Sequence, residues 1–170
     1  MKGIGVSLLH LPLKDKIPIT IQTKETMRKH FTILIFLLIG SLQVYAQEIT
    51  LFDSNGNARA YIDYNDDATI YLWNGKPVAF LENDGNDMCV FGFNGNFLGW
   101  YEDGVIYNDD GDAVGARNGA TNMITNIEPI KSIQEISPIR PITPITPISP
   151  IFSNSWSSEN LTEFFYKGKK

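Results

Sequence analysis

Residues 69–80 read Thr-Ile-Tyr-Leu-Trp-Asn-Gly-Lys-Pro-Val-Ala-Phe, two runs of apolar and aromatic residues that meet at Asn74-Gly75. Such dipeptides favour two-residue hairpin turns of type I′, because that turn needs a positive φ at both central positions and asparagine and glycine tolerate it best. The β-branched and aromatic residues before the turn are typical of a strand. The stretch therefore predicts a β-hairpin with its tip at Asn74 and Gly75.

The same pattern occurs four times along the chain. The turn glycines are spaced by 19, 20 and 16 residues, which fits one hairpin per repeat. The predicted structural turns are Asn55-Gly56, Asn74-Gly75, Asn94-Gly95 and Asp110-Gly111. The incoming strands are Ile49–Phe52, Thr69–Trp73, Cys89–Phe93 and Val105–Tyr107. Short polar links, such as Asp103-Gly104, join one hairpin to the next.

A small residue recurs four positions after each turn glycine, at Ala60, Ala79, Gly99 and Gly115. It is followed by Tyr61, Phe80, Trp100 and, in the last copy, Ala116. A small residue at the same place in every copy indicates that backbones crowd together there, as around a central axis. Its bulky neighbour faces the other way, because side chains alternate along a strand. A lone hairpin is marginal in water, so we expect the four to share one core over residues 47–117.

These repeats resemble the four-fold β-flower proteins. The resemblance rests on Leu51-Phe52-Asp53 with Gly56, on Ile70–Gly75, on Phe91–Gly95 and on Leu98-Gly99-Trp100, and it continues loosely into the tail. It implies an all-β fold of four consecutive β-hairpins about a pseudo-four-fold axis, in exported bacterial proteins without an established activity. In this family each hairpin is called a petal. Ala116 departs from the aromatic pattern of the other three copies, so we expect the fourth petal to be thinner.

Residues 27–46 have the organisation of a signal peptide. Met27-Arg28-Lys29-His30 precede the apolar run Phe31–Leu42, and Ala46 offers a small residue for cleavage before Gln47. The apolar run is shorter than the roughly 20 residues of a membrane-spanning helix. We therefore expect an exported protein, periplasmic, secreted or at the cell surface, with translation starting at Met27 and residues 1–26 an over-long start or a disordered leader. The alternative is an uncleaved single-span anchor through residues 31–46.

Charge and residue types exclude several functions. Residues 1–46 hold six of the 14 basic residues and two of the 19 acidic ones, which leaves a net charge of −9 for the rest. An acidic surface disfavours nucleic-acid binding. Both histidines, His10 and His30, precede the predicted cleavage point, and Cys89 is the single cysteine and is expected to be buried. The mature chain therefore lacks the residues for a Ser-His-Asp or Cys-His site, and we predict no enzyme and no cofactor.

The tail changes character after Arg117. We divide it into a linker at 118–137, a Pro-Ile repeat at 138–151 and a C-terminal segment at 152–170 with a short helix. Isoleucine occupies every third position from Ile127 to Ile151, and a polyproline II helix, with three residues per turn, would align these side chains on one ridge. Either the ridge lies in a groove on the domain or on a partner, or the segment is a stiff spacer. We favour docking.

Two sets of residues are candidates for binding. Acidic turns at Asp53, Asn55, Asp110 and Asp112 resemble calcium loops but lack the bidentate glutamate of an EF-hand, so turn chemistry is the preferred explanation. The aromatic residues Trp73, Trp100 and Tyr101 could form a surface platform for a glycan or a peptide.

The function expected from these features is a non-catalytic exported binding or interaction module with an unknown glycan or protein ligand. A structural spacer or envelope component is the alternative. A carboxylate-dependent enzyme acting on glycans is a remote third hypothesis, because the many carboxylates fit a solvated acidic rim.

Overall fold

The computed structural model describes residues 30–31 and 48–169. Most of the predicted signal peptide and all of the predicted leader lie outside these residues. Within the described residues, no helix has the length and apolar character needed to cross a membrane. Residues 48–169 contain eight strands: β1 (Glu48–Phe52), β2 (Ala58–Asp63), β3 (Thr69–Leu72), β4 (Pro77–Asp84), β5 (Asp87–Gly92), β6 (Phe97–Glu102), β7 (Val105–Tyr107) and β8 (Ala113–Ala116). They also contain the 3-10 turn η1 (Tyr64–Asp66) and the helix α2 (Leu161–Tyr166).

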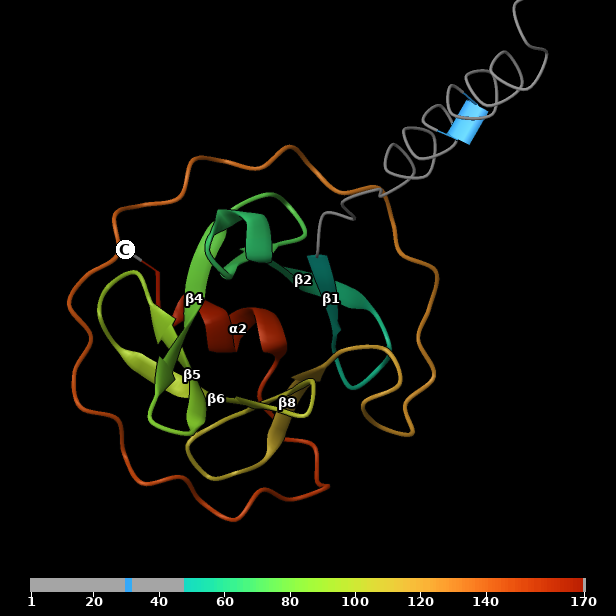
Figure 1. Ribbon diagram of the computed structural model, residues 1–170. Helices are drawn as coiled ribbons and strands as arrows, with labels where there is room; N and C mark the ends of the chain where they lie inside the picture. The colour runs from blue at the N-terminus through green and yellow to red at the C-terminus, as the bar shows by residue number, and fades with distance from the viewer. Residues whose placement is uncertain (1–29, 32–47, 170) are drawn as a thin grey trace, which may run out of the picture. The chain divides into compact units, whose positions relative to one another are not determined.

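The strands form a closed barrel in which each strand pairs antiparallel with its neighbours in sequence. A single pair, Phe52 with Ala116, closes the ring between β1 and β8. The four hairpins β1–β2, β3–β4, β5–β6 and β7–β8 stand around a common axis (Figure 1). The predicted all-β fold of four consecutive hairpins is confirmed.

The four hairpin tips share one geometry, which differs from the predicted type I′ turn. At each tip the glycine N–H donates to the carbonyl three residues earlier, as from Gly75 to Leu72 at 2.8 Å. The four glycines have φ between 75° and 87°, whereas the preceding Asn or Asp is not among the residues with positive φ. This is the three-residue loop with a glycine bulge, and each hairpin accordingly shifts register beside its tip. The predicted positions are right, and the two-residue type I′ geometry is wrong.

The type I′ pattern occurs instead at the opposite end of the barrel. Asp103 and Gly104 both have positive φ, at 50° and 88°, and connect β6 to β7 through the pair Glu102–Val105. What the sequence suggested was a polar link is therefore a tight hairpin turn. Consecutive hairpins also pair with each other, β2 with β3, β4 with β5 and β6 with β7, and the four repeats therefore close into one sheet.

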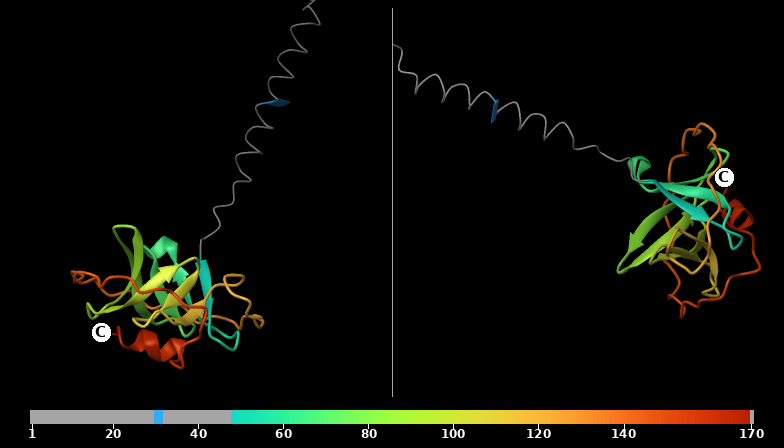
Figure 2. Two further views of the ribbon diagram at one scale, coloured as in Figure 1. Left: turned by 90° about the horizontal axis from the view of Figure 1, so that it is seen from below. Right: turned by 90° about the vertical axis from the view of Figure 1, so that its right-hand side faces the viewer.

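After β8 the chain encircles the barrel without regular secondary structure (Figure 2). We call residues 124–153 the belt. The tail docks on its own domain, as expected, but residues 118–137 and the Pro-Ile repeat form one continuous path around it. Among the described residues, the tail lies along the barrel rather than extending away from it (Figure 1).

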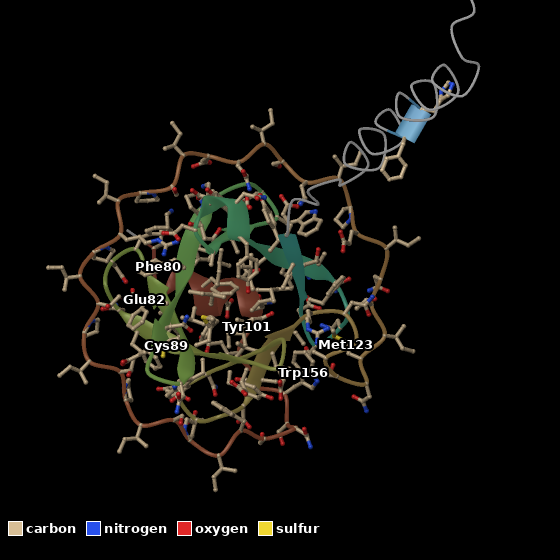
Figure 3. All side chains as sticks on the ribbon, in the orientation of Figure 1. Phe80, Glu82, Cys89, Tyr101, Met123 and Trp156 are labelled. Atoms are coloured by element: carbon tan, nitrogen blue, oxygen red, sulfur yellow. The ribbon has the colours of Figure 1, made fainter. Side chains whose placement is uncertain are left out.

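The outward face of the barrel is buried beneath this tail. Phe80, Phe91, Phe93 and Trp100 form a cluster with Cys89, and Phe152 from the tail packs against it. Figure 3 shows Phe80 and Cys89 between the strands and the belt, whereas Tyr101 lies within the ring of strands. At the fourth petal, where Ala116 replaces an aromatic residue, Met123 and Trp156 from the tail pack against it instead.

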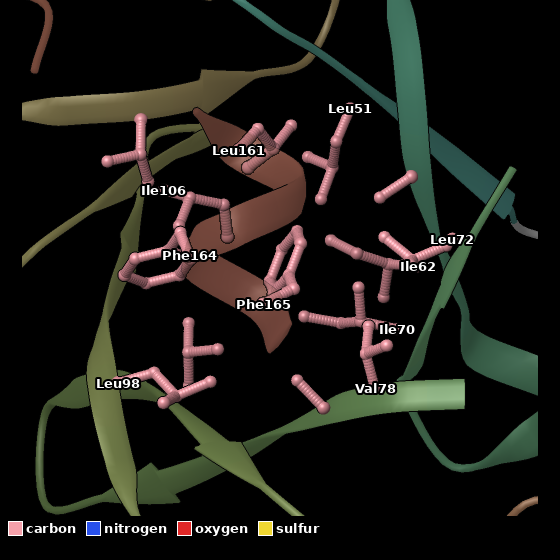
Figure 4. Close-up of a cluster of buried hydrophobic side chains, with 14 of the residues drawn as sticks. Leu51, Ile62, Ile70, Leu72, Val78, Leu98, Ile106, Leu161, Phe164 and Phe165 are labelled. Carbon is pink, nitrogen blue, oxygen red and sulfur yellow. The ribbon is translucent and has the colours of Figure 1, made fainter. Parts of the chain in front are cut away.

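The inward face is filled by α2. Leu161, Phe164 and Phe165 are at most 1% exposed and pack against inward side chains from β1 to β8 (Figure 4). The small residues predicted to crowd an axis make room for this helix. A methyl group on Gly115 would lie 2.7 Å from Leu161 Cδ1. At Gly99 the closer obstacle is the neighbouring strand, because a methyl group there would lie 1.9 Å from the Tyr107 carbonyl oxygen and 3.3 Å from Phe164. Asn160 caps the helix by accepting a hydrogen bond from the Thr162 N–H at 2.8 Å.

The turn glycines Gly75 and Gly95 provide a matched test of how the belt is seated. Their φ values are 85° and 87°, but a methyl group on Gly75 would lie 2.1 Å from the Ile133 carbonyl oxygen, whereas one on Gly95 would meet only Pro141 at 3.7 Å. Backbone strain costs roughly 1–2 kcal/mol in either alanine variant. We expect Gly75→Ala to lower the free energy of unfolding in urea by about 1 kcal/mol more than Gly95→Ala does, because the belt must move to make room for the methyl group on residue 75. Equal losses would contradict this seating of the belt.

Candidate interaction surface

The belt contacts the barrel through two of its three edges. One edge consists of the residues that follow the isoleucines, which reach carboxylates at the rim of the barrel. Gln134 donates to Asp63 at 2.9 Å and Thr143 donates to Glu82 at 3.3 Å. Lys131 pairs with Glu48, Arg140 pairs with Asp67, and Thr146 bonds to Asp84. We expected the carboxylates at the rim of the barrel to be solvated. Several of them instead bind side chains of the belt.

The second edge consists of backbone N–H groups that donate to carbonyls at the hairpin tips. Asn126 donates to Gly56 at 2.8 Å, Glu135 to Gly75 at 2.9 Å and Ser153 to Gly111 at 2.9 Å. We call these donors the anchors of the belt. Glu135 follows Asn126 by nine residues, and Ser153 follows Glu135 by eighteen, which is two such steps. The missing member of the series falls on Pro144, which has no N–H to offer to Gly95. Nine residues of belt thus correspond to one petal, and the four-fold repeat of the barrel extends into the tail.

The third edge carries the isoleucines, and it faces away from the barrel. Ten of them, at every third position from Ile124 to Ile151, have exposed fractions between 87% and 99%. The three-residue period predicted the ridge correctly. Of the two predicted docking sites, a groove on the domain itself is not occupied by the ridge, because the belt presents its polar edges to the barrel and leaves its apolar edge free. A groove on a partner stays a prediction.

The three candidate platform residues do not come together. Trp100 is 2% exposed within the phenylalanine cluster, so it is not a surface ring. Trp73 lies edge-on to Tyr61 at 5.9 Å and donates from Nε1 to the Pro129 carbonyl of the belt. Tyr101 packs against the interior cluster, where burial raises its pKa to about 12. Cys89 is fully buried, and burial with nearby carboxylates raises the pKa of its thiol to about 11.

The candidate calcium loops use their oxygens within the turns. Asp53 accepts from the N–H groups of Asn55 and Asn57 and forms an ion pair with Arg59 at 2.7 Å. In the last hairpin Asn108 accepts from the Asp112 N–H, and Asp112 accepts from Ser153 at 2.8 Å, while Asp110 is exposed. Across the described residues, no group of three or more His, Cys, Asp or Glu side chains is placed to share a metal ion.

Two aspartates at the ends of the barrel strands, Asp53 and Asp63, have lowered pKa values. Burial alone would raise the pKa of Asp53, but the bonds from Arg59, Asn57 and Asn55 outweigh it. At Asp63, likewise, burial opposes and the bonds from Gln134 and the turn prevail, so its pKa is also lowered. Both groups therefore stabilise the fold most when ionised.

We expect the urea midpoint to be constant near neutral pH and to fall as the pH drops below about 4, the ordinary pKa of an aspartate in an unfolded chain. The sign follows because the unfolded chain takes up these protons first. Asp53→Asn should lower the free energy of unfolding at pH 7 by about 1 kcal/mol and reduce the acid-side slope, leaving the part due to Asp63. If the free energy of unfolding falls with pH on the acid side as steeply in both Asp53→Asn and Asp63→Asn as in the parent, these two carboxylates are not the source of the pH dependence.

Comparison with known proteins identifies the family. A family model described as 4-fold beta flower protein matches residues 49–165, from β1 into α2. No curated protein and no solved structure matches the chain. The family is not a known family of enzymes. The match includes the belt and the helix as well as the four hairpins, and the chain is therefore a member of the 4-fold beta flower family.

Proposed function

We propose that this chain is a non-catalytic interaction module that presents the isoleucine edge of its belt to an apolar partner. The observation that carries the proposal is the exposure of ten isoleucines at 87–99%, all on one edge. Soluble proteins seldom leave contiguous apolar surface of several hundred Å² uncovered, and where they do it commonly marks an interaction site.

The other hypotheses have less support from the geometry. A glycan platform needs exposed rings, whereas Trp100 is buried and Trp73 is tied to the belt backbone. A spacer needs an extended tail, whereas the belt is bonded to three of the four hairpin tips. The carboxylates that a glycan-active enzyme would use include Asp63 and Glu82, which accept from belt side chains. An apolar interaction surface is therefore the best-supported function.

Site-specific photo-crosslinking in the producing cells tests this function. A crosslinker at Ile142, which is 98% exposed, should give discrete adducts, because the partner covers this edge. The matched control is Asn86, which is exposed in the β4–β5 turn and is not part of the belt. Adducts from Asn86 but from no belt position would refute the proposal.

We further propose that the protein works outside the cytoplasm. The predicted mature end at Gln47 lies directly before β1, which starts at Glu48, so cleavage there would leave the barrel intact. Mass spectrometry of the purified protein should find Gln47 as the first residue. A chain that retains residues 31–46 would support the membrane-anchor alternative instead.

A further inference from the structure

The isoleucine edge differs from an ordinary binding patch because it surrounds the domain. The belt follows the outside of the barrel past all four petals (Figure 1), and its isoleucines are exposed along the whole path. The nine-residue spacing divides nine of the ten isoleucines, all but Ile124, into three sets of three, which follow Asn126, Glu135 and Pro144. The sets are 127, 130 and 133; 136, 139 and 142; and 145, 148 and 151.

From this arrangement we infer that the partner is a second copy of this chain, and that copies associate edge to edge through their belts. The inference rests on the proposed function and names its partner. One set of three isoleucines offers on the order of 300 Å² of apolar surface, well below the roughly 800 Å² per partner of a stable pairwise interface. A single rigid partner would cover one set of three isoleucines and leave the other two sets in water. Several copies of this chain, arranged around the belt, would cover all three sets.

The charge distribution favours a second copy. Residues 47–170 carry 8 basic and 17 acidic residues, a net charge of −9. The belt holds two of each, Lys131, Arg140, Glu128 and Glu135, so it is neutral and the remainder carries the entire −9. Like charges repel two copies that approach through their acidic surfaces. The belt is the strip along which two copies approach with least repulsion.

The shape of the edge also matches itself. In a polyproline II helix, isoleucines three residues apart stand about 9 Å from one another, which leaves a gap that accepts one side chain from an identical ridge. A self-complementary contact of this kind lets the same surface serve on both partners.

A lipid surface is a less suitable partner. Acidic residues flank the belt at both ends of the barrel, for example Glu82 and Asp84 at one end and Asp109 and Asp110 at the other. A hydrocarbon phase that covered the whole ring would have to take in these carboxylates, at high cost.

Sedimentation velocity on the processed protein, over a range of concentrations, tests the inference. The weight-average mass should rise with concentration to at least about twice that of the monomer, without a single discrete dimer. It should rise further between about 0.1 M and about 1 M salt, because the screening length falls from about 10 Å to about 3 Å and the acidic surfaces repel less. A protein that stays monomeric at both salt concentrations, or that associates less at high salt, would overturn the inference.

Variants assign the association to the belt. Changing all nine isoleucines at 127–151 to serine should leave a monomer, and changing one set of three should reduce the association in part. These side chains are at least 89% exposed, so the melting temperature and the protection of Cys89 from thiol reagents should not change, which verifies folding. The control replaces exposed rings that are not part of the belt, Tyr64→Ser and Tyr166→Ser, and should associate like the parent. Association that survives in the nine-serine variant would refute the inference.

Two further outcomes separate this inference from the proposed function. A monomer that binds zwitterionic phosphatidylcholine vesicles through the belt would replace the second copy with a lipid surface. A monomer whose Ile142 crosslinks in cells yield adducts to a different protein would overturn self-association and leave the proposed function standing.

Discussion

The close approach of the belt backbone to the hairpin tips is the constraint on which the rest of the domain depends. Carbonyl oxygens of Ile124, Ile133 and Ile151 lie where a Cβ on Gly56, Gly75 or Gly111 would have to be, at 2.1, 2.1 and 2.7 Å. Only a residue without a side chain permits this contact, and glycine also supplies the left-handed conformation that the turn requires. One residue type thus determines both how each hairpin reverses and how far from the barrel the belt runs.

Both faces of the sheet are buried, and each by a different part of the tail. The helix places Leu161, Phe164 and Phe165 in the interior of the barrel. The aromatic residues on the exterior lie beneath the belt, which packs Phe152 against them. The strands are three to eight residues long, so a barrel of this size has little core of its own. The tail supplies what is missing, and at the petal with Ala116 it adds Trp156 where the other petals have their own aromatic residue.

The sequence predicted the repeats, the turn positions and the alternation of small inward and bulky outward residues, because these depend on local chemistry and on a period of two. It did not predict the loop type, since Asn74-Gly75 suits a two-residue turn as well as a three-residue loop, and the register of β3 against β4 decides between them. The orientation of the belt was also missed. The sequence left open whether the apolar edge lies on the domain or on a partner. Extended backbone without internal hydrogen bonds needs external partners, and the tip carbonyls and rim carboxylates provide them, so the polar edges face the barrel. The pairing of Gln134 with Asp63, 71 residues away, has no local signal in the sequence.

The position of α2 inside the barrel has a consequence for how the domain is made. The helix starts 45 residues after the last strand ends, so the ribosome completes all eight strands before the three side chains that fill their centre exist. Until then the strands lack the side chains that fill their centre and the segment that covers their aromatic exterior. Synthesis from the N-terminus therefore delays the fully packed state until residues 161–165, which supply these side chains, have been made.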